Sequence, residues 1–344
     1  MRWDNLQIVP EGNRPDLPLI ERQAVVRTID TPEFRGMTFY EIHAKSIINK
    51  VPGASRVPFN WTINPYRGCS HSCKYCFARK THEYLDLNSG SDFDSKIVVK
   101  VNAAELVRKE LAAPKWGGQH IAMGTNVDCY QRAEGRYRLM PGILTALRDT
   151  RNPFSILTKG SLILRDLPLL QEAAERTEVG TAVSVGFLDK ELWRLTEPGA
   201  PSPHKRLQVC TTLNEHDIPC GVLMGPILPY LADSPRQIDA AVRQIAETGA
   251  PSVSAITLHL RPGAREWYMS WLREHHPELV GPYERLYGRG AYAPKTYQET
   301  ISRRVREAAD KHGIGRGRTA RNAHRRTPPA PPAPPPAAEQ LFLL

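Results

Sequence analysis

Three cysteines, Cys69, Cys73 and Cys76, stand close together in the pattern C-x3-C-x2-C. Six cysteines in 344 residues are too few for a disulfide framework, and clustered cysteines in a reducing compartment are more often metal ligands. A structural zinc site needs four ligands, usually in two closely spaced pairs, but the other three cysteines are isolated and His71 and His82 lack zinc-finger spacing to the triad. Three thiolates on one short loop favour a 4Fe-4S cluster whose fourth iron keeps an open position for a substrate or cofactor.

The elements that must position these cysteines alternate between apolar β-rich runs and helical patterns. Six strands are expected, at residues 61–66, 121–124, 154–158, 181–186, 220–224 and 253–259. Helices are expected at residues 102–114, with Asn102 as N-cap, at 140–150, at 165–176, and at 233–250, with Asp233 or Ser234 as N-cap and Gly249 as terminator. This alternation predicts a parallel sheet, either doubly wound or curled into a full or partial barrel, with ligands at the C-terminal ends of the strands.

The chain divides into four stretches. Residues 1–36 are polar and interrupted by proline, and are expected to be an N-terminal extension that packs on the main body. The main body covers residues 37–262 and opens, at 37–51, with a predicted strand that leads into a short helix. Residues 263–312 are helical and rich in aromatic residues, which predicts a layer that covers one edge of the sheet. Residues 313–344 are basic and rich in proline, which predicts a disordered or polyproline II tail.

The formal net charge of +10 is concentrated at one end of the chain. Residues 301–344 carry nine Lys or Arg and three acidic residues, so +6 lies there and +4 remains for the first 300 residues. A basic tail binds phosphates weakly and says little about what the folded body recognises. Neither a long apolar run nor a signal-peptide pattern is found, so no membrane span is expected and the protein is expected in the cytoplasm.

The cysteine motif, with Tyr75 directly before its third cysteine, follows the first predicted strand of a (β/α) repeat. In these features the chain resembles the radical S-adenosylmethionine (SAM) superfamily. The resemblance implies a partial (β/α)6 TIM-like barrel in which Cys69, Cys73 and Cys76 hold a 4Fe-4S cluster and the open iron binds SAM. It also implies a reductant such as flavodoxin or ferredoxin, whose electron releases methionine and a 5'-deoxyadenosyl radical that abstracts hydrogen from the substrate. The protein then has to position these groups and exclude water.

Five sequence blocks narrow the resemblance to one branch. They are YRGCSHSCKYCFARKTHEYL, IAMGTNVDCYQRAEGRYRL, SILTKGSLILRDLPLL, VSVGFLDKELWRLTEPGAPSPHKRL and GVLMGPILPYLADS. Together they resemble the spore photoproduct lyase-like branch, and more closely an actinobacterial group of uncharacterised proteins described by analogy as DNA repair photolyases. The resemblance covers about residues 37–300. It implies a lyase- or transferase-like reaction on a nucleic-acid base, by repair or modification.

The resemblance also implies roles for several residues of this chain. Tyr75 and Phe77 are expected to line the adenine and cluster side. Gly124, Thr125 and Asn126 stand where the superfamily's glycine-rich second-strand motif contacts the methionine amino group of SAM. Each position also has a plain structural alternative; Gly124, for example, also fits a simple turn.

Lys159 and Ser184 follow the third strand and lie on the fourth, where the branch places contacts to the SAM carboxylate or ribose; a lysine suits a carboxylate. Cys129 lies just beyond the second strand, near the position of a hydrogen-atom donor in the lyases, and Tyr130 is a candidate radical relay. The alternative for Cys129 is a small buried residue, and Cys210 and Cys220 are expected to be core thiols.

Glu197 and Arg206 begin and nearly end the segment EPGAPSPHKRL. Its prolines and glycine fix its shape, so it fits either a substrate or cofactor wall or a rigid connector across which the two charges pair. His259 and Arg261 come at and just after the end of the sixth strand, where a barrel would point them at the substrate opening.

Two classes of function fit the sequence. The leading interpretation is a radical SAM enzyme, with a nucleic-acid base, a peptide, tRNA or a small metabolite as substrate. The dispersed cysteines cannot supply an auxiliary four-thiolate cluster, which disfavours peptide-maturing members that need one. A charge of only +4 on the body is modest for a protein that grips duplex phosphates. The alternative is a non-catalytic iron-sulfur protein that binds DNA through its tail or senses redox state.

Overall fold

The computed structural model of the protein describes residues 24–315 except 30, 54–56 and 289. Most of the N-terminal extension and of the basic tail predicted above therefore lie outside the described residues. No helix within the described ranges is long and apolar enough to cross a membrane.

The main sheet has seven strands in the order β3-β4-β7-β8-β9-β10-β11, and it carries the predicted (β/α) repeat. The strands from β4 to β11 are parallel, and β3 is antiparallel to β4. Their bounds are β3 Ile48–Lys50, β4 Trp61–Ile63, β7 Ile121–Met123, β8 Phe154–Thr158, β9 Val179–Ser184, β10 Cys220–Ile227 and β11 Val253–Thr257. Each of the six expected strands is confirmed, and the six parallel strands form the expected partial TIM-like barrel.

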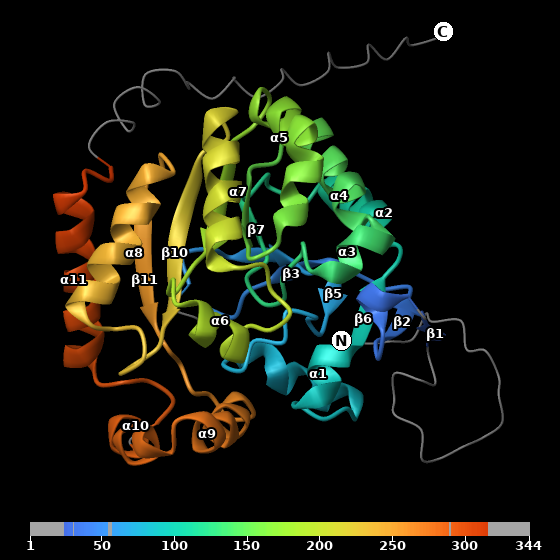
Figure 1. The fold of residues 1–344 in the computed structure, drawn as a ribbon. Helices are drawn as coiled ribbons and strands as arrows, with labels where there is room; N and C mark the ends of the chain where they lie inside the picture. Colours follow the sequence, from blue (N-terminus) through green and yellow to red (C-terminus); the bar gives the residue numbers. More distant parts are fainter. Residues whose placement is uncertain (1–23, 30, 54–56, 289, 316–344) are drawn as a thin grey trace, which may run out of the picture.

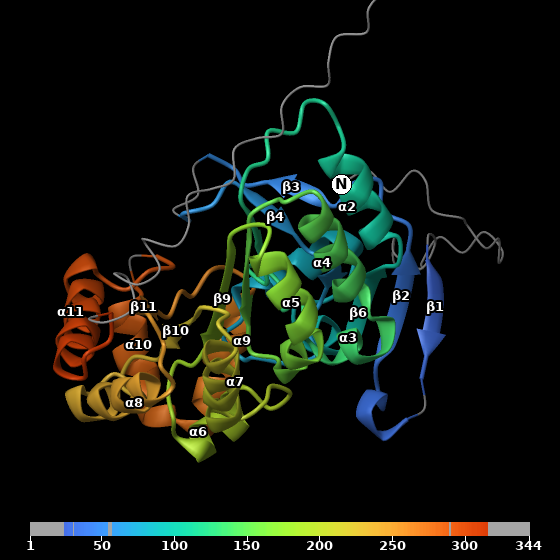
Figure 2. The ribbon, with the colours of Figure 1, turned by 90° about the horizontal axis from the view of Figure 1, so that it is seen from above.

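Helices cover the outer side of this curved sheet, as Figure 2 shows. They are α2 Ala103–Leu111, α4 Leu139–Asp149, α5 Leu167–Ala174, α7 Pro203–Glu215 and α8 Pro235–Glu247. In α8 the buried side chains of Ile238, Ala241, Val242 and Ile245 repeat at helical spacing. Ser234 and its partner at the third helical position form a capping box, which confirms Ser234 as the N-cap.

A second sheet, which the sequence did not indicate, packs beside the barrel. Its order is β1-β2-β6-β5. The strands are β1 Val25–Thr28, β2 Thr38–Ile42, β5 Tyr66–Arg67 and β6 Lys96–Lys100. Because β2 pairs with β6, more than fifty residues away along the chain, a local pattern gives no sign of this sheet.

The helix expected after β2 is wrong, because residues 48–50 form strand β3. The Glu110 carboxylate accepts hydrogen bonds from the backbone N–H groups of Ile47 (2.8 Å) and Ile48 (2.9 Å), which holds this segment extended beside β4. Asn102 does precede α2, but its side chain does not cap that helix. It exchanges two hydrogen bonds of 2.9 Å with the backbone of Ala44 instead. In both cases a distant partner replaces the local bond that the pattern suggested.

The C-terminal helices are α9 Ala264–His275, α10 Val280–Leu286 and α11 Lys295–Lys311. The last of them, α11, packs on α8 and on the edge strand β11, as expected. Figure 1 shows that α9 and α10 lie instead beyond the C-terminal ends of β10 and β11. Tyr268 and Trp271 of α9 are buried in an apolar cluster that also contains Cys73 and Tyr75, so this layer helps to close the end of the barrel where the site lies.

Candidate active site

The cysteine loop, residues 68–76, lies between β5 and the 3-10 helix η2, Phe77–Leu85. It starts at Gly68, whose φ of +81° favours glycine and where a Cβ would lie 2.8 Å from both His82 Cε1 and the Lys96 carbonyl oxygen. The loop contains all three motif cysteines: Cys69 and Cys73 are buried and Cys76 is half-buried.

The donor set of this loop fits an iron-sulfur cluster. Within the described residues, no group of three or more His, Cys, Asp or Glu side chains is arranged to hold a single metal ion. In a 4Fe-4S cluster each thiolate binds a different iron, so three free thiols on one loop need not converge on one point. Burial raises the pKa of all three thiols, that of Cys73 to about 12, so binding of irons has to displace their protons.

Arg79 anchors the loop from the η2 side. Its guanidinium is fully buried and donates to the Cys73 carbonyl from Nη2 (2.9 Å) and Nε (3.2 Å). The same Nη2 pairs with Asp94 at 2.8 Å, and the guanidinium lies over the rings of Phe93 (5.2 Å) and Trp267 (4.9 Å). Sequence reasoning missed Arg79, since its partners lie on segments that only the fold brings together.

Two residues from other loops hold the opposite side of the cysteine loop. Gln131 accepts a hydrogen bond from the Ser70 N–H and donates one to the Gly68 carbonyl, both at 2.9 Å. The Gly199 N–H donates to the His71 carbonyl at 3.1 Å, and a Cβ on Gly199 would lie 1.9 Å from the Ser70 carbonyl oxygen. Gln131 had not been singled out from the sequence, whereas Gly199 is the glycine that was expected to help fix the segment EPGAPSPHKRL, and its close backbone packing fits that expectation.

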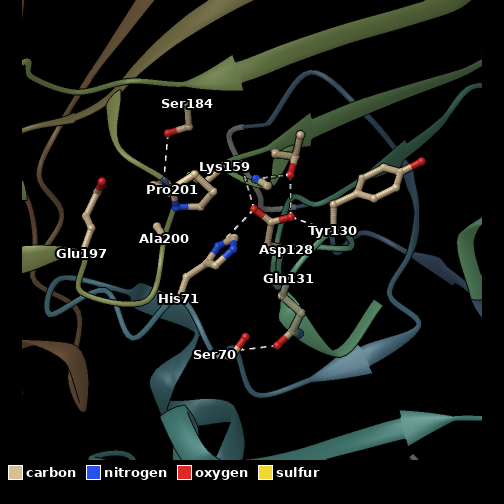
Figure 3. A network of polar contacts seen from close by, with 12 residues as sticks. Ser70, His71, Asp128, Tyr130, Gln131, Lys159, Ser184, Glu197, Ala200 and Pro201 are labelled. Atoms are coloured by element: carbon tan, nitrogen blue, oxygen red, sulfur yellow. Dashed lines mark hydrogen bonds and ion pairs between the residues drawn. The ribbon is translucent and has the colours of Figure 1, made fainter. Parts of the chain in front are cut away.

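Asp128 is the centre of a polar network shown in Figure 3. Its carboxylate accepts hydrogen bonds from the N–H of Tyr130 (2.9 Å), the hydroxyl of Thr158 (2.7 Å) and the N–H of Lys159 (2.6 Å). His71 Nδ1 of the cysteine loop lies 3.3 Å from Asp128 Oδ2. Burial raises the pKa of this carboxyl, but His71 and the hydrogen bonds outweigh burial and lower the pKa to about 2.

The structure brings the predicted residues Tyr75, Lys159 and Ser184 together. The Lys159 ammonium donates to Ser184 Oγ at 3.0 Å and lies 5.8 Å above the centroid of the Tyr75 ring. Ser184 Oγ in turn donates to the Gly225 carbonyl at 2.7 Å. These three side chains come from the cysteine loop, the end of β8 and the end of β9, so only the barrel places them in one site.

Glu197 and Arg206 form the buried ion pair that was one of the two alternatives for their segment. Each side chain is 1% exposed, and the Tyr75 hydroxyl also bonds to Glu197. Arg206 further donates to the carbonyls of Pro201 (2.7 Å) and Ser184 (3.0 Å). Burial raises the pKa of the Glu197 carboxyl, but Arg206 and other partners outweigh it and lower the pKa, so the pair stays charged. The pair holds the hydroxyl end of the Tyr75 side chain in place.

The loop after β7 begins with the predicted residues Gly124, Thr125 and Asn126, which are half-buried. Gly124 has a φ of +74°, and a Cβ there would lie 1.8 Å from the Leu157 carbonyl oxygen of the neighbouring strand. Only glycine therefore fits this position without moving the backbone.

Cys129 and Tyr130 follow in the same loop and are buried. Cys129 lies in the main apolar core, and the Tyr130 hydroxyl donates to Asp166 at 3.1 Å. In Figure 3 the Tyr130 ring points away from Asp128 and Lys159. Their catalytic roles stay predictions. Cys210 and Cys220 are fully buried core thiols, as expected.

Phe77, His259, Arg261 and Tyr292 form what we call the aromatic wall. Phe77 directly follows the cysteine loop and is 44% exposed, and Tyr292 is 40% exposed. The Arg261 guanidinium carbon lies 6.0 Å from the centroid of Phe77 and 5.9 Å from that of Tyr292, and Nη2 donates to the Tyr292 hydroxyl at 2.7 Å. The rings of His259 and Tyr292 lie 4.5 Å apart. Phe77, predicted to line the adenine side, thus faces a cation on a half-open surface.

The chain is similar to several known proteins. A protein of Mycobacterium tuberculosis, itself uncharacterized, is 47% identical over 332 residues, which covers 96% of each chain. Spore photoproduct lyase complexed with dinucleoside spore photoproduct matches with a TM-score of 0.61 at 14% identity, over 91% of this chain and 86% of that one. A doubly substituted variant of that lyase, with bound AdoMet (SAM) and the same dinucleoside, matches with a TM-score of 0.59 at 15% identity, over 76% of each chain.

These likenesses to solved structures show the fold alone. The model of the Radical SAM superfamily matches residues 63–258, which include the cysteine loop and the strands from β7 to β11. This match covers more than half of the chain and agrees with the barrel. The protein belongs to the radical SAM superfamily and is an enzyme with a 4Fe-4S cluster and SAM as its cofactors.

Proposed function

We propose that this radical SAM enzyme acts on a base of a nucleic acid and that Cys69, Cys73 and Cys76 hold its cluster. When bound, the cluster and SAM supply the reductive cleavage that gives methionine and a 5'-deoxyadenosyl radical, which abstracts hydrogen from the substrate. The electron comes from a reductant, for which we propose a flavodoxin or a ferredoxin.

The residues around Lys159 support the SAM part of the proposal. An ammonium group carries three N–H donors, so Lys159 can bind a carboxylate while it also donates to Ser184. The Tyr75 ring beneath it is fixed by the Glu197 hydrogen bond and by the ion pair behind it. We assign Lys159 to the carboxylate of SAM, Tyr75 to the adenine and cluster side, and Gly124, Thr125 and Asn126 to the methionine amino group. Phe77, which was also expected on the adenine and cluster side, is 44% exposed, and we assign it to the substrate instead.

The aromatic wall is the observation that carries the choice of substrate. Two half-exposed rings, Phe77 and Tyr292, flank the Arg261 guanidinium beside the exit of the cysteine loop. A ring face binds a base by stacking, and a guanidinium binds the neighbouring phosphate or stacks as well. This combination suits an unpaired nucleotide better than a peptide or an aliphatic metabolite. The solved lyase complex with a dinucleoside shares the fold and adds an analogy at fold level.

Cys129 and Tyr130 enter the proposal as a hydrogen-atom donor and a radical relay. Cys129→Ala tests the first role in D2O, because a thiol exchanges its hydrogen with the solvent and would pass deuterium to the product. If the thiol returns hydrogen to the product, the variant still cleaves SAM but stops forming the normal product. If Cys129 only fills the core, product formation falls in proportion to the loss of folded protein.

The first experiment tests the chemistry. The protein is reconstituted anaerobically with iron and sulfide, reduced and mixed with SAM, and 5'-deoxyadenosine is quantified beside a Cys76→Ala variant. We expect product from the wild type and only background from the variant, because two thiolates cannot hold the cluster in place. Full iron content and product in Cys76→Ala would refute the ligand assignment.

The second experiment tests the substrate. Short single-stranded DNA and RNA of matched sequence are added to the same reaction, with an uncharged peptide as control. We expect nucleic acid to raise 5'-deoxyadenosine formation and the peptide to leave it unchanged. Nucleic acid would be excluded as the substrate class if 5'-deoxyadenosine formed at the same rate with and without every oligonucleotide and if no oligonucleotide bound to the protein.

A further inference from the structure

One carboxylate, with 10% of its side chain exposed, lies where three loops of the barrel meet. Asp128 belongs to the loop after β7, its Oδ2 lies 3.3 Å from His71 of the cysteine loop, and the same oxygen accepts from the Lys159 N–H of the loop after β8. Its Oδ1 accepts from the Thr158 hydroxyl. Figure 3 shows His71 and Lys159 approaching Asp128 from different segments of the chain.

The contacts use both oxygens of Asp128. Oδ1 accepts from Tyr130 and Thr158, while Oδ2 accepts from Lys159 and lies next to His71. Every one of these partners is a donor or can be one, and a carboxylate is the side chain that accepts on both atoms. An amide of the same shape has one accepting oxygen, and its NH2 group would face an N–H donor. The arrangement therefore specifies Asp rather than Asn.

The position of Lys159 depends on this carboxylate. The bond from the Lys159 N–H fixes the backbone from which its side chain reaches Ser184 and the face of Tyr75. His71, at the other end of the network, sits between Cys69 and Cys73 and is 3% exposed. One side chain thus ties the loop that carries the thiols to the loop that carries the ammonium.

We propose that Asp128 is a positioning residue that joins the cysteine loop to the Lys159 loop, so that the cluster site and the SAM site form as one unit. This inference rests on the cofactor assignments proposed above and is independent of the nucleic-acid substrate. It assigns Asp128 no contact with the reacting atoms.

The test compares Asp128→Asn, Lys159→Met and the double variant, each reconstituted as the complete chain. Iron content, the EPR signal of the reduced cluster and the equilibrium affinity for SAM are measured without nucleic acid. Asp149→Asn is the matched control, because that carboxylate is half-exposed on α4 and pairs with Arg148 there. We expect full iron in all variants and an affinity for SAM about tenfold weaker in each single variant, the loss expected for one charge-assisted bond.

The double variant tests whether Asp128 acts through Lys159. If Asp128 acts through Lys159, the double variant binds SAM no more weakly than Lys159→Met, since the coupled losses do not add. The EPR signal without SAM should change in Asp128→Asn, through His71, but not in Lys159→Met. The proposal would be overturned if the double variant lost the product of the two single-variant fold-losses in SAM affinity. It would also be overturned if Asp128→Asn bound SAM as tightly as the wild type does.

A second variant covers the case in which Asp128→Asn fails to load iron. Thr158→Val removes one donor to Asp128 and leaves every charge in place. Weaker SAM binding with full iron supports the positioning role, and wild-type affinity refutes it. The assignment of the three cysteines as cluster ligands has its own test, because it fails if Cys76→Ala keeps its iron.

Discussion

The two sides of the site at the C-terminal ends of the strands are built differently. On the side of β4, β7 and β8, the cysteine loop is held by the buried side chains of Arg79 and Gln131, which bond to its backbone, and by Asp128, which contacts His71. On the side of β11, the aromatic wall presents half-exposed rings around Arg261. Under the proposed function, the cofactors occupy the rigid side, because they need a fixed site, and the substrate enters at the exposed side.

The ion pair behind Tyr75 gives the largest expected loss of stability on the rigid side. Arg206→Met leaves the Glu197 carboxylate buried without its charge partner, and we expect the free energy of unfolding to fall by about 3–5 kcal/mol. Denaturant unfolding measures it. The double variant Glu197→Leu/Arg206→Met should recover much of the loss, because apolar side chains remove the uncompensated charge. A single variant as stable as the wild type would mean that this side is less rigid than the contacts indicate.

The rigid side should also lose stability in acid through His82. Burial lowers the pKa of His82 to about 4, the ring packs against Gly68, and its Nε2–H donates to the Lys96 carbonyl at 2.8 Å. The unfolded chain binds this proton at about pH 6.5, so the stability present above pH 6.5 is lost as the pH falls to about 4, by at most about 3 kcal/mol.

Unfolding curves between pH 4 and 7 check this expectation. His82→Gln keeps a donor for the Lys96 carbonyl and does not titrate, so the pH dependence should flatten in that variant. An equal slope in wild type and variant would assign the acid sensitivity to other groups.

Substitutions in the aromatic wall should change the affinity for oligonucleotides and leave the free energy of unfolding unchanged. Phe77→Ala removes one stacking face, and we expect affinity for a single-stranded oligonucleotide to fall by about 1–3 kcal/mol with the unfolding curve unchanged. Arg261→Gln should lower the slope of log K against log salt by about one, because one phosphate contact is lost. If both variants bound the oligonucleotide as the wild type does, the exposed side would not be the substrate side.

The smallest effect is expected from the basic tail. Deletion of residues 316–344 removes five arginines and one glutamate, so weak, salt-dependent DNA binding should decrease. Cleavage of SAM should not change, because the family match and the site lie within residues 63–258 and the helices that follow. Loss of SAM cleavage on truncation would give the tail a role in the site itself.

The repeat of strands and the cysteine spacing were readable from the sequence because both are local. Apolar runs bounded by turn residues marked the six parallel strands, and C-x3-C-x2-C marked the cluster loop. The second sheet was not readable, since β2 finds its partner β6 far along the chain. The short helix expected after β2 does not form for the same reason: Glu110, on α2, accepts hydrogen bonds from the backbone of Ile47 and Ile48.

The sequence by itself determined the chemistry of this protein: three thiols in one loop, Lys159 after one strand, Ser184 on the next, and the family that this pattern indicates. The tertiary structure alone decided which residues from outside the motif contact these groups. Asp128 and Gln131 reach the cysteine loop across about sixty residues of chain, and Arg261 meets Phe77 across the barrel. Parallel strands bring their C-terminal ends to one edge of the sheet, so a site built there collects residues whose distance in sequence hides their contact.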